Sequence, residues 1–397
     1  MDLTPGLRRI RAADLGDVGE ETQLVARIRA EIAARGPMTF ARFMELALYD
    51  PEWGYYRSAE PRPGRDGDFL TAPESHPIFG WTLAVQLAEL WDLLERPPRF
   101  VVREHGAGAG ALAAATLDGL RRSGSSLLDV VRWEPVEIEP RREVAFGQHL
   151  ETAGFGDQTG PPGEEPVVGV VLANEVLDAL PTHRVTASDG VLREVLVGWS
   201  GDRGFHDVVA APSTDAIAAR LEAEGIQLRD GQRAEVCLAI DPWLARAARG
   251  LRRGVLLAVD YGAAASELYD PARRPLGTLR AYLRHTVHDD LYGHLGRQDL
   301  TAHVDVTAVE RAAADAGLDH LGVTTQAEFL AALGAGELLR SMQDDPATTL
   351  QDYLAARAAL GRMLDPAVTG RFRVMAFGRD LPAGAALTGL AGFADSP

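Results

Sequence analysis

The residues with the clearest chemical potential are three alternating glycines that follow a short apolar segment. Gly106, Gly108 and Gly110 come directly after residues 100–105, which favour a buried strand, and before an alanine-rich segment that favours a helix. Glycine permits a sharp turn and a close approach of the backbone to a ligand. A strand, a glycine turn and a helix start together are typical of a nucleotide-type site, although a glycine turn alone is weak evidence.

The residues around these glycines narrow the class of ligand. A dinucleotide site uses G-x-G-x-x-G spacing and holds a pyrophosphate at the helix N-terminus, whereas here Glu104 precedes the glycines and Ala107 separates the first two. A carboxylate repels a pyrophosphate but suits a cationic or hydroxyl-rich ligand, such as the amino-acid end of S-adenosylmethionine. The residues that we place in this predicted cofactor loop are Glu104, Gly106, Ala107, Gly108 and Gly110.

A second candidate feature is the acidic end of residues 133–139, which alternate as a strand would. This end follows Glu104 by about one βαβ unit, and a carboxylate at that position is the standard partner of ribose hydroxyls in adenosine-binding folds. We assign this role to Glu137 and place Ile138 beside it in the cofactor site. The alternative is a solvated strand end, with Glu139 next in line if Glu137 does not bind.

Polar residues also follow the most apolar segment of the chain. Residues 166–174 form a continuous apolar run, as a fully buried parallel strand would. Polar groups at the carboxyl end of such a strand lie in the binding crevice of an open α/β sheet. We therefore add Asn174 to the cofactor residues and choose Glu175 and Asp178 as the catalytic candidates. For either acid, the alternative is capping of the following turn or binding of the cofactor's amino group.

The segment 51–80 is long, aromatic and rich in glycine and proline. A long loop in a compact domain is usually functional or disordered, and the aromatic side chains argue against disorder. We expect either a packed surface loop or a lid over the ligand site, with Gly67 and Thr71 near the cofactor. The histidines of residues 263–304 fit no usual metal-ligand spacing, so we predict a structured substrate loop there and no metal site.

Composition excludes several classes of function. The 397 residues include no lysine, so the 40 basic residues are all arginines, and a Walker A loop or a Schiff-base lysine is excluded. The net charge of −17 disfavours nucleic acid and anionic membranes, and the single cysteine, Cys237, excludes internal disulfides. Without a signal-like or membrane-spanning apolar run, we expect a soluble cytoplasmic protein with no membrane insertion. The sequence leaves a homodimer open.

Strands and helices alternate, which predicts an α/β fold with a mainly parallel sheet. We expect an N-terminal helical and lid segment at 1–98, a core at 99–380 with insertions at 183–230 and 263–304, and a loose tail at 381–397. Within these parts we expect an exposed Arg103, an amphipathic helix at 78–95, β-hairpins in 183–211 and a helix over 232–250. The seven predicted strand positions are 100–105, 133–138, 150–160, 167–173, 254–260, 320–325 and 371–377.

Several separate stretches resemble one family, the MidA-like methyltransferases, which include the mitochondrial protein arginine methyltransferase that assists complex I assembly. The set spans residues 43–305 in the family's order, and its most specific stretches are those at 173–181 and within 277–305. The matching stretches are FMELALYDPEWGYY (43–56), GDFLTAPE (67–74), REHGAGAGAL (103–112), VEIEPRRE (136–143), ANEVLDALP (173–181), VDYG (259–262), and GTLRAYLRHTVHDDL with GRQDLTAHVD (277–305).

The resemblance implies a class I, Rossmann-like, seven-stranded methyltransferase fold, S-adenosylmethionine as cofactor, and methyl transfer to an arginine of a partner protein such as a respiratory complex I subunit. The chain departs from the family at Ala107, where proline is frequent, at Glu139, where serine is frequent, and at Val176-Leu177, where two phenylalanines are frequent. The last departure concerns the substrate pocket. A non-catalytic assembly factor with the same fold and a methyltransferase for a small molecule or nucleic acid are the alternatives.

An arginine acceptor would explain the acids that follow the apolar strand. A guanidinium keeps its charge at neutral pH because its pKa is above about 12. Carboxylates can orient it through a two-pronged contact and direct one nitrogen toward a methyl group. We therefore expect Glu175 and Asp178 to hold the acceptor, and a cationic protein segment suits this acidic chain better than nucleic acid does.

Overall fold

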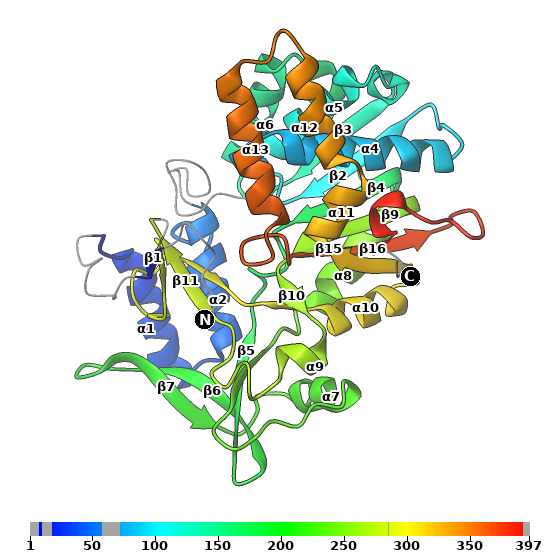
Figure 1. The fold of residues 1–397 in the computed structure, drawn as a ribbon. Coiled ribbons are helices and arrows are strands. Elements are labelled where there is room, and N and C mark those ends of the chain that lie inside the picture. Colours follow the sequence, from blue (N-terminus) through cyan, green and yellow to red (C-terminus); the bar gives the residue numbers. More distant parts are fainter. Residues whose placement is uncertain (1–7, 10–17, 58–71, 285, 392–397) are drawn as a thin grey trace.

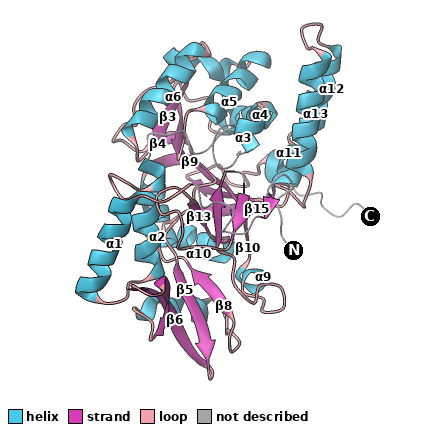
Figure 2. Ribbon diagram, turned by 90° about the vertical axis from the view of Figure 1, so that its left-hand side faces the viewer, coloured by secondary structure: helices cyan, strands magenta, loops and turns pink. Residues whose placement is uncertain are grey.

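The computed structural model describes residues 8–9, 18–57, 72–284 and 286–391. Its centre is a mixed six-stranded sheet in the order β15-β16-β9-β4-β2-β3 (Figures 1 and 2). Strands β3, β2, β4 and β9 are parallel, and β16 is antiparallel to both of its neighbours. The strands are β2 (Phe100–His105), β3 (Val131–Val136), β4 (Val167–Asn174), β9 (Leu251–Asp260), β15 (Asp319–Thr325) and β16 (Arg373–Arg379).

Six of the seven predicted strands are therefore present, and the weak one at 150–160 is wrong. Helix α6 (Pro140–Thr152) and the 3-10 turn η4 (Gly156–Gln158) occupy that stretch, and a single parallel bridge from Thr159 to Trp133 follows. The next residues include Pro161 and Pro162, which have no N–H to donate to a neighbouring strand. The bridge cannot extend into a strand for this reason.

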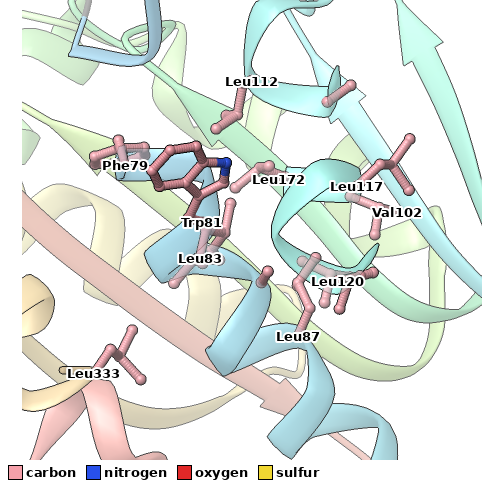
Figure 3. Packing of buried hydrophobic residues seen from close by; sticks show 14 of the residues in the cluster. Phe79, Trp81, Leu83, Leu87, Val102, Leu112, Leu117, Leu120, Leu172 and Leu333 are labelled. Carbon is pink, nitrogen blue, oxygen red and sulfur yellow. The ribbon is translucent and has the colours of Figure 1, made fainter. Parts of the chain in front are cut away.

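Alternating side chains of the sheet pack into two separate layers of helices. Val102 and Leu172 face one layer and Val101 and Val171 face the other, as the two-residue period of a strand requires. Figure 3 shows α4 and α5 packed over the first face. The helices that supply the first layer are α4 (Ile78–Leu93), α5 (Ala111–Arg122), α6, α11 (Gln326–Ala332), α12 (Ala335–Asp344) and α13 (Leu350–Leu364), and those of the second are α8 (Ile240–Arg249) and α10 (Val306–Asp315).

A second lobe is formed by segments that are far apart in the sequence (Figure 1). Helices α1 (Thr22–Arg35) and α2 (Phe40–Tyr49) pack their apolar faces against residues of both insertions, including Val197 and Leu300. Thr39 caps α2, because its side chain accepts a hydrogen bond from the backbone N–H of Arg42 at 3.1 Å. The N-terminal helices therefore use the insertions, rather than the central sheet, to bury their apolar surface.

The insertions supply most strands of this lobe, and β1 and β8 come from outside them. One sheet has the order β7-β6-β5-β8, and the predicted hairpins in 183–211 are its strands β5, β6 and β7. A smaller sheet has the order β1-β12-β11-β13, and β10 pairs with β14. Their bounds are β1 (Arg8–Arg9), β5 (His183–Ser188), β6 (Val191–Ser200), β7 (Gly204–Ala210), β8 (Arg233–Val236), β10 (Gly262–Ala263), β11 (Arg280–Leu283), β12 (Thr286–His288), β13 (Asp299–Thr301) and β14 (Val304–Asp305).

Short helices complete the described chain. None of the helices in the described residues is long and apolar enough to cross a membrane. The short helices are η2 (Tyr55–Arg57), α3 (Ala72–Ser75), η3 (Ser126–Asp129), α7 (Asp215–Ala223), α9 (Ala265–Leu268) and η5 (Thr388–Leu390).

Four local predictions are wrong because tertiary contacts override the local pattern. The first part of 232–250 is strand β8, which pairs with β5. Arg103 is buried, and its Nη2 lies 2.7 Å from the Glu134 carboxylate on the next strand. Helix α4 is buried along most of its length, because it lies between α5 and the C-terminal helices. In the tail, Leu387 is buried and the Gly389 N–H donates to Gln86 of α4 at 3.0 Å.

Candidate functional site

The glycine turn connects β2 to α5 at the carboxyl end of the sheet. Gly106, Gly108 and Gly110 all have positive φ angles, of 67°, 58° and 86°, which other residues rarely adopt. A side chain at Gly108 would meet no heavy atom of the described residues within 4 Å, whereas a Cβ at Gly110 would lie 2.7 Å from Leu150 of α6. Gly108 thus faces open space, as a ligand-contacting glycine must. Gly110 is explained by close packing, and Ala107 beside it is buried.

The acid at the end of β3 lies over this turn. Oε1 of Glu137 accepts a hydrogen bond from the backbone N–H of Gly108 at 2.5 Å. Burial raises the pKa of the Glu137 carboxyl, against the lowering effect of that hydrogen bond. The neighbouring Ile138 side chain is 41% exposed, and the Arg57 side chain donates to the Ile138 carbonyl. The predicted pairing of glycine turn and strand-end acid is therefore present.

Glu104 has a protein partner of its own. Its side chain is buried, and one carboxylate oxygen accepts a hydrogen bond from the indole Nε1 of Trp133 at 2.7 Å. Burial raises the pKa of Glu104 to about 8, despite the hydrogen bond from Trp133. A carboxyl whose pKa is raised by burial is a weaker attraction for a cation than the sequence indicates.

The loop after β4 departs from regular geometry at the predicted catalytic residues. Glu175 has a φ of 53°, a conformation that is unfavourable for a residue other than glycine and that is concentrated at functional sites. Its backbone N–H donates to the Val259 carbonyl of β9 at 2.8 Å. The Asn174 amide lies 3.4 Å from Oε1 of Glu175. These contacts bring the predicted cofactor residue and one predicted catalytic acid side by side.

A buried acid from the neighbouring strand holds this loop in place. Oδ2 of Asp260 accepts hydrogen bonds from the consecutive backbone N–H groups of Val176, Leu177 and Asp178, at 3.1, 2.8 and 3.3 Å. Burial raises the pKa of Asp260 well above its ordinary value, and the charges of Asp178 and Glu175 add to the effect. Asp260 is thus a structural anchor for the residues that carry the candidate chemistry.

Within the described part of the chain, Asp178 has one carboxylate oxygen with a hydrogen-bond donor and one without. Its side chain is buried, and Oδ2 accepts a hydrogen bond from the Tyr261 hydroxyl at 2.5 Å. Oδ1 is buried without a hydrogen-bond donor among the described residues. Burial raises the pKa of Asp178 to about 6, although the Tyr261 hydroxyl opposes the shift. A buried acceptor without a donor is rare in native proteins and is typical of a position where a ligand supplies the donor.

Aromatic residues of the second lobe stand next to Asp178. The Tyr49 hydroxyl donates to the carbonyl of Ala179 at 2.9 Å, and the Tyr49 ring stacks on Tyr56 at a centroid distance of 5.6 Å. The Tyr56 hydroxyl lies 3.1 and 3.0 Å from the two oxygens of Asp299, which is buried. The site therefore joins the carboxyl ends of two central strands to the second lobe.

Sequence reasoning missed several of these residues. Asp260 and Tyr261 follow a buried strand, so the strand-end rule that selected Asp178 would have found them as well. Tyr49, Tyr56 and Asp299 lie in stretches that match the family, but no pattern in the sequence indicates that folding brings them together. Gly67 and Thr71, which we predicted near the cofactor, lie outside the described residues. Within the described parts of the chain, no group of three or more histidines, cysteines or acids is arranged to hold a metal ion.

A family model, curated relatives and a solved structure all place the chain among methyltransferases. Residues 82–324 match the model of a family of S-adenosyl-L-methionine-dependent methyltransferases. The chain is 27% identical to the mitochondrial protein arginine methyltransferase NDUFAF7 homolog of Drosophila melanogaster, over 89% of this chain and 84% of that protein. It is 28% identical to the human mitochondrial protein arginine methyltransferase NDUFAF7, over 81% and 76%. A Burkholderia thailandensis structure bound to S-adenosyl-homocysteine has a TM-score of 0.84 and 32% identity, covering 97% of this chain and 98% of that one.

These similarities confirm the predicted α/β methyltransferase fold, and they confirm S-adenosylmethionine as the cofactor. The residues of the glycine turn fit such a ligand. Gly108 leaves room for a close approach to the backbone, and Glu137 places a carboxylate at the strand end where ribose hydroxyls bind in adenosine-binding folds.

Proposed function

The chain belongs to the family of S-adenosyl-L-methionine-dependent methyltransferases, and we propose that it methylates an arginine side chain of a partner protein. Two relatives that cover most of its length are named protein arginine methyltransferases, at 27% and 28% identity. The acidic and aromatic character of the site next to the cofactor loop supports a cationic acceptor. The acceptor is therefore inferred from the chemistry of the site together with these names.

The observation that carries the proposal is the unsatisfied oxygen of Asp178. Leaving a buried acceptor without a donor costs about 1–3 kcal/mol, and more for a charged group. Oδ1 of Asp178 is in this state, while Tyr261 already occupies Oδ2. An N–H group of a bound guanidinium would satisfy Oδ1 through a charge-assisted hydrogen bond.

The role of the acids in transfer is to hold and aim the acceptor. A guanidinium spreads its charge over a planar fork, and carboxylates that bind this fork fix which nitrogen points forward. We assign this task to Asp178 and, beside it, to Glu175, whose unusual backbone conformation is held by the loop. Correct orientation and the exclusion of water account for most of the acceleration expected in such a displacement.

The cofactor residues of the proposal are the ones at the carboxyl ends of β2, β3 and β4. S-adenosylmethionine, when bound, supplies an electrophilic methyl group on a positively charged sulfur. We assign the close backbone contact to Gly108, the ribose contact to Glu137 and a polar contact at the strand end to Asn174. Glu104 is assigned to the same site, with Trp133 holding one of its oxygens.

The proposal is tested by identifying the methylated product. Purified protein is incubated with cofactor labelled at the methyl group and with soluble protein from cells that lack the gene. Acid hydrolysis and chromatography then identify the labelled amino acid, which we expect to be a methylated arginine. Label in another amino acid, in nucleic acid or in small molecules would contradict the proposal. Cofactor binding by calorimetry without any transfer to the protein fraction would favour a non-catalytic assembly factor.

A further inference from the structure

Tyr56 and Asp299 form a second carboxylate–tyrosine contact beside the first. The Tyr56 hydroxyl lies within hydrogen-bond distance of both oxygens of Asp299, and the backbone N–H of Leu300 donates to Oδ1 at 2.9 Å. Asp299 is 1% exposed. Its position is thus fixed by two partners from different segments of the second lobe, one in η2 and one in β13.

This second contact is adjacent to Asp178. The backbone N–H of Ala302, three residues after Asp299, donates to the Asp178 carbonyl at 2.9 Å. Tyr49 connects the two acids, because its hydroxyl reaches Ala179 and its ring stacks on Tyr56. Burial raises the pKa of Tyr49 well above its ordinary value, and the charges of Asp299 and Asp178 raise it further. Both acids are therefore within electrostatic reach of one tyrosine.

The same tyrosine stack borders the cofactor side of the site. The Arg142 guanidinium lies 5.7 Å from the centre of the Tyr56 ring, five residues after Glu137. The next residue after Tyr56, Arg57, donates its side chain to the Ile138 carbonyl, and its own carbonyl accepts from Arg141 at 2.8 Å. Segment 55–57 therefore lies between the loop that carries Glu137 and the acids Asp178 and Asp299.

We propose that Asp299, held by Tyr56, is a positioning residue that makes the site selective for a planar cationic acceptor. The inference rests on the function proposed above. Asp178 and Asp299 are both within electrostatic reach of Tyr49 and Tyr56, so a cation that binds beside these tyrosines is attracted by both carboxylates. A guanidinium suits this setting better than an ammonium, because it is planar, more weakly hydrated and stacks on aromatic faces.

The test uses the labelled-protein assay with Asp299→Asn, which keeps the size of the side chain and removes its charge. We expect the apparent KM for acceptor protein to rise by about tenfold or more, with a smaller change in kcat, because a contact that binds and orients the acceptor is lost. The dissociation constant for S-adenosyl-homocysteine, measured by calorimetry, should stay within about twofold of the wild-type value. Asp299→Glu, which retains the charge, should recover part of the loss in KM.

A second variant keeps the inference testable if Asp299→Asn does not fold. Tyr56→Phe keeps the ring stack and the Leu300 contact but removes the hydroxyl that holds Asp299, and it should raise KM about three- to tenfold. The matched control is Tyr292→Phe, which breaks a similar tyrosine–aspartate contact to Asp207 and should leave KM unchanged. If the label is in arginine and neither Asp299→Asn nor Tyr56→Phe changes KM, the inference is overturned and the proposed function stands. If the wild type labels no arginine, the proposed function itself fails.

Discussion

Two tyrosine–aspartate pairs in this molecule share the same hydrogen bond but differ in the other partners of the aspartate. The Tyr292 hydroxyl donates to Asp207 at 2.5 Å, and the Tyr261 hydroxyl donates to Asp178 at the same distance. Asp207 also binds the buried guanidinium of Arg184 at 2.7 Å and the exposed guanidinium of Arg233 at 3.0 Å. At Asp178, by contrast, one oxygen has no donor among the described residues.

The electrostatics of the two acids follow from this difference. Burial would raise the pKa of Asp207, but hydrogen bonds from Arg184 and Tyr292 outweigh it and hold that pKa below its ordinary value. Burial raises the pKa of Asp178 to about 6, and no arginine of the described residues is among the groups that oppose this shift. Asp207 is a structural ion-pair site, completed by the Arg184 guanidinium over the Phe40 ring at 5.2 Å. The chain thus contains an example of the complex that we propose Asp178 forms with a substrate.

The sharpest test of the comparison is the loss of charge at each acid. Asp178→Asn should reduce single-turnover methyl transfer to protein by about 100-fold or more, since a charge-assisted contact in a dry site is lost and each ~1.4 kcal/mol is a factor of ten. The variant should not lower the free energy of unfolding, because no ion pair among the described residues is broken and a destabilising buried charge is removed. Near-normal transfer would give Asp178 a structural role.

A second variant distinguishes residues that bind the acceptor from residues that bind the cofactor. Glu137→Ala should weaken S-adenosyl-homocysteine binding by about 1.5–3 kcal/mol, the range for hydrogen bonds to a charged group. Asp178→Asn should leave that affinity unchanged in the same calorimetric titration. Equal losses of cofactor affinity in both variants would place Asp178 in the cofactor site instead.

The reverse pattern is expected at the other pair. Asp207→Asn leaves the buried guanidinium of Arg184 with a neutral partner, and it should lower the free energy of unfolding by about 2 kcal/mol. This loss is below the range of about 3–5 kcal/mol for broken buried pairs because the Asp207 side chain is 26% exposed. Chemical denaturation measures this change, and kcat at a temperature where the variant is folded should equal that of the wild type. A loss of transfer without a loss of stability would contradict the distinction between the two pairs.

Sequence reasoning succeeded where the signal is local. The glycine turn, the acid after β3 and the acids after β4 each follow a strand that can be recognised from its own residues, and parallel strands bring their carboxyl ends to one edge. The contact between Glu137 and Gly108 follows from that rule. Whether a glycine is needed for a ligand or for packing is not visible in the sequence, as Gly108 and Gly110 show.

Sequence reasoning failed where distant segments meet. Tyr56 and Asp299 are 243 positions apart, and neither has a neighbouring pattern that indicates its partner. Arg103 was expected on the surface because its type is usually exposed, but Glu134 on the adjacent strand neutralises it inside the protein. The Arg103–Glu134 pair depends on the register between β2 and β3, and the Tyr56–Asp299 pair depends on the packing of η2 against β13. Neither is encoded in a local pattern of the sequence.

The two pairs should also respond in opposite directions to pH. The pKa of Asp178 is raised to about 6 in the folded protein. Between the ordinary pKa of an aspartate and about 6, the folded protein therefore holds a proton that the unfolded chain releases. The free energy of unfolding falls as the pH rises through this window, because Asp178 ionises at a cost in the folded protein. The pKa of Asp207 is lowered, so its stabilising effect is present above its ordinary value and is lost as the pH falls through the lowered value. Difference titrations of wild type against each Asp→Asn variant measure both effects, and parallel curves would contradict the assignment.

The smallest expected effects come from the hydroxyls. Tyr261→Phe removes the hydrogen bond that opposes the raised pKa of Asp178, so that pKa should rise further. Transfer needs the ionised carboxylate, and kcat/KM should therefore fall several-fold near pH 6 and recover by about pH 8. Tyr292→Phe removes a contact of the same length from Asp207, which keeps Arg184, and should leave the pH profile of kcat/KM unchanged. Profiles measured from pH 5.5 to about 9 compare the two variants. If both profiles match the wild type, the tyrosine does not tune Asp178, and if both shift, the two pairs are not functionally distinct.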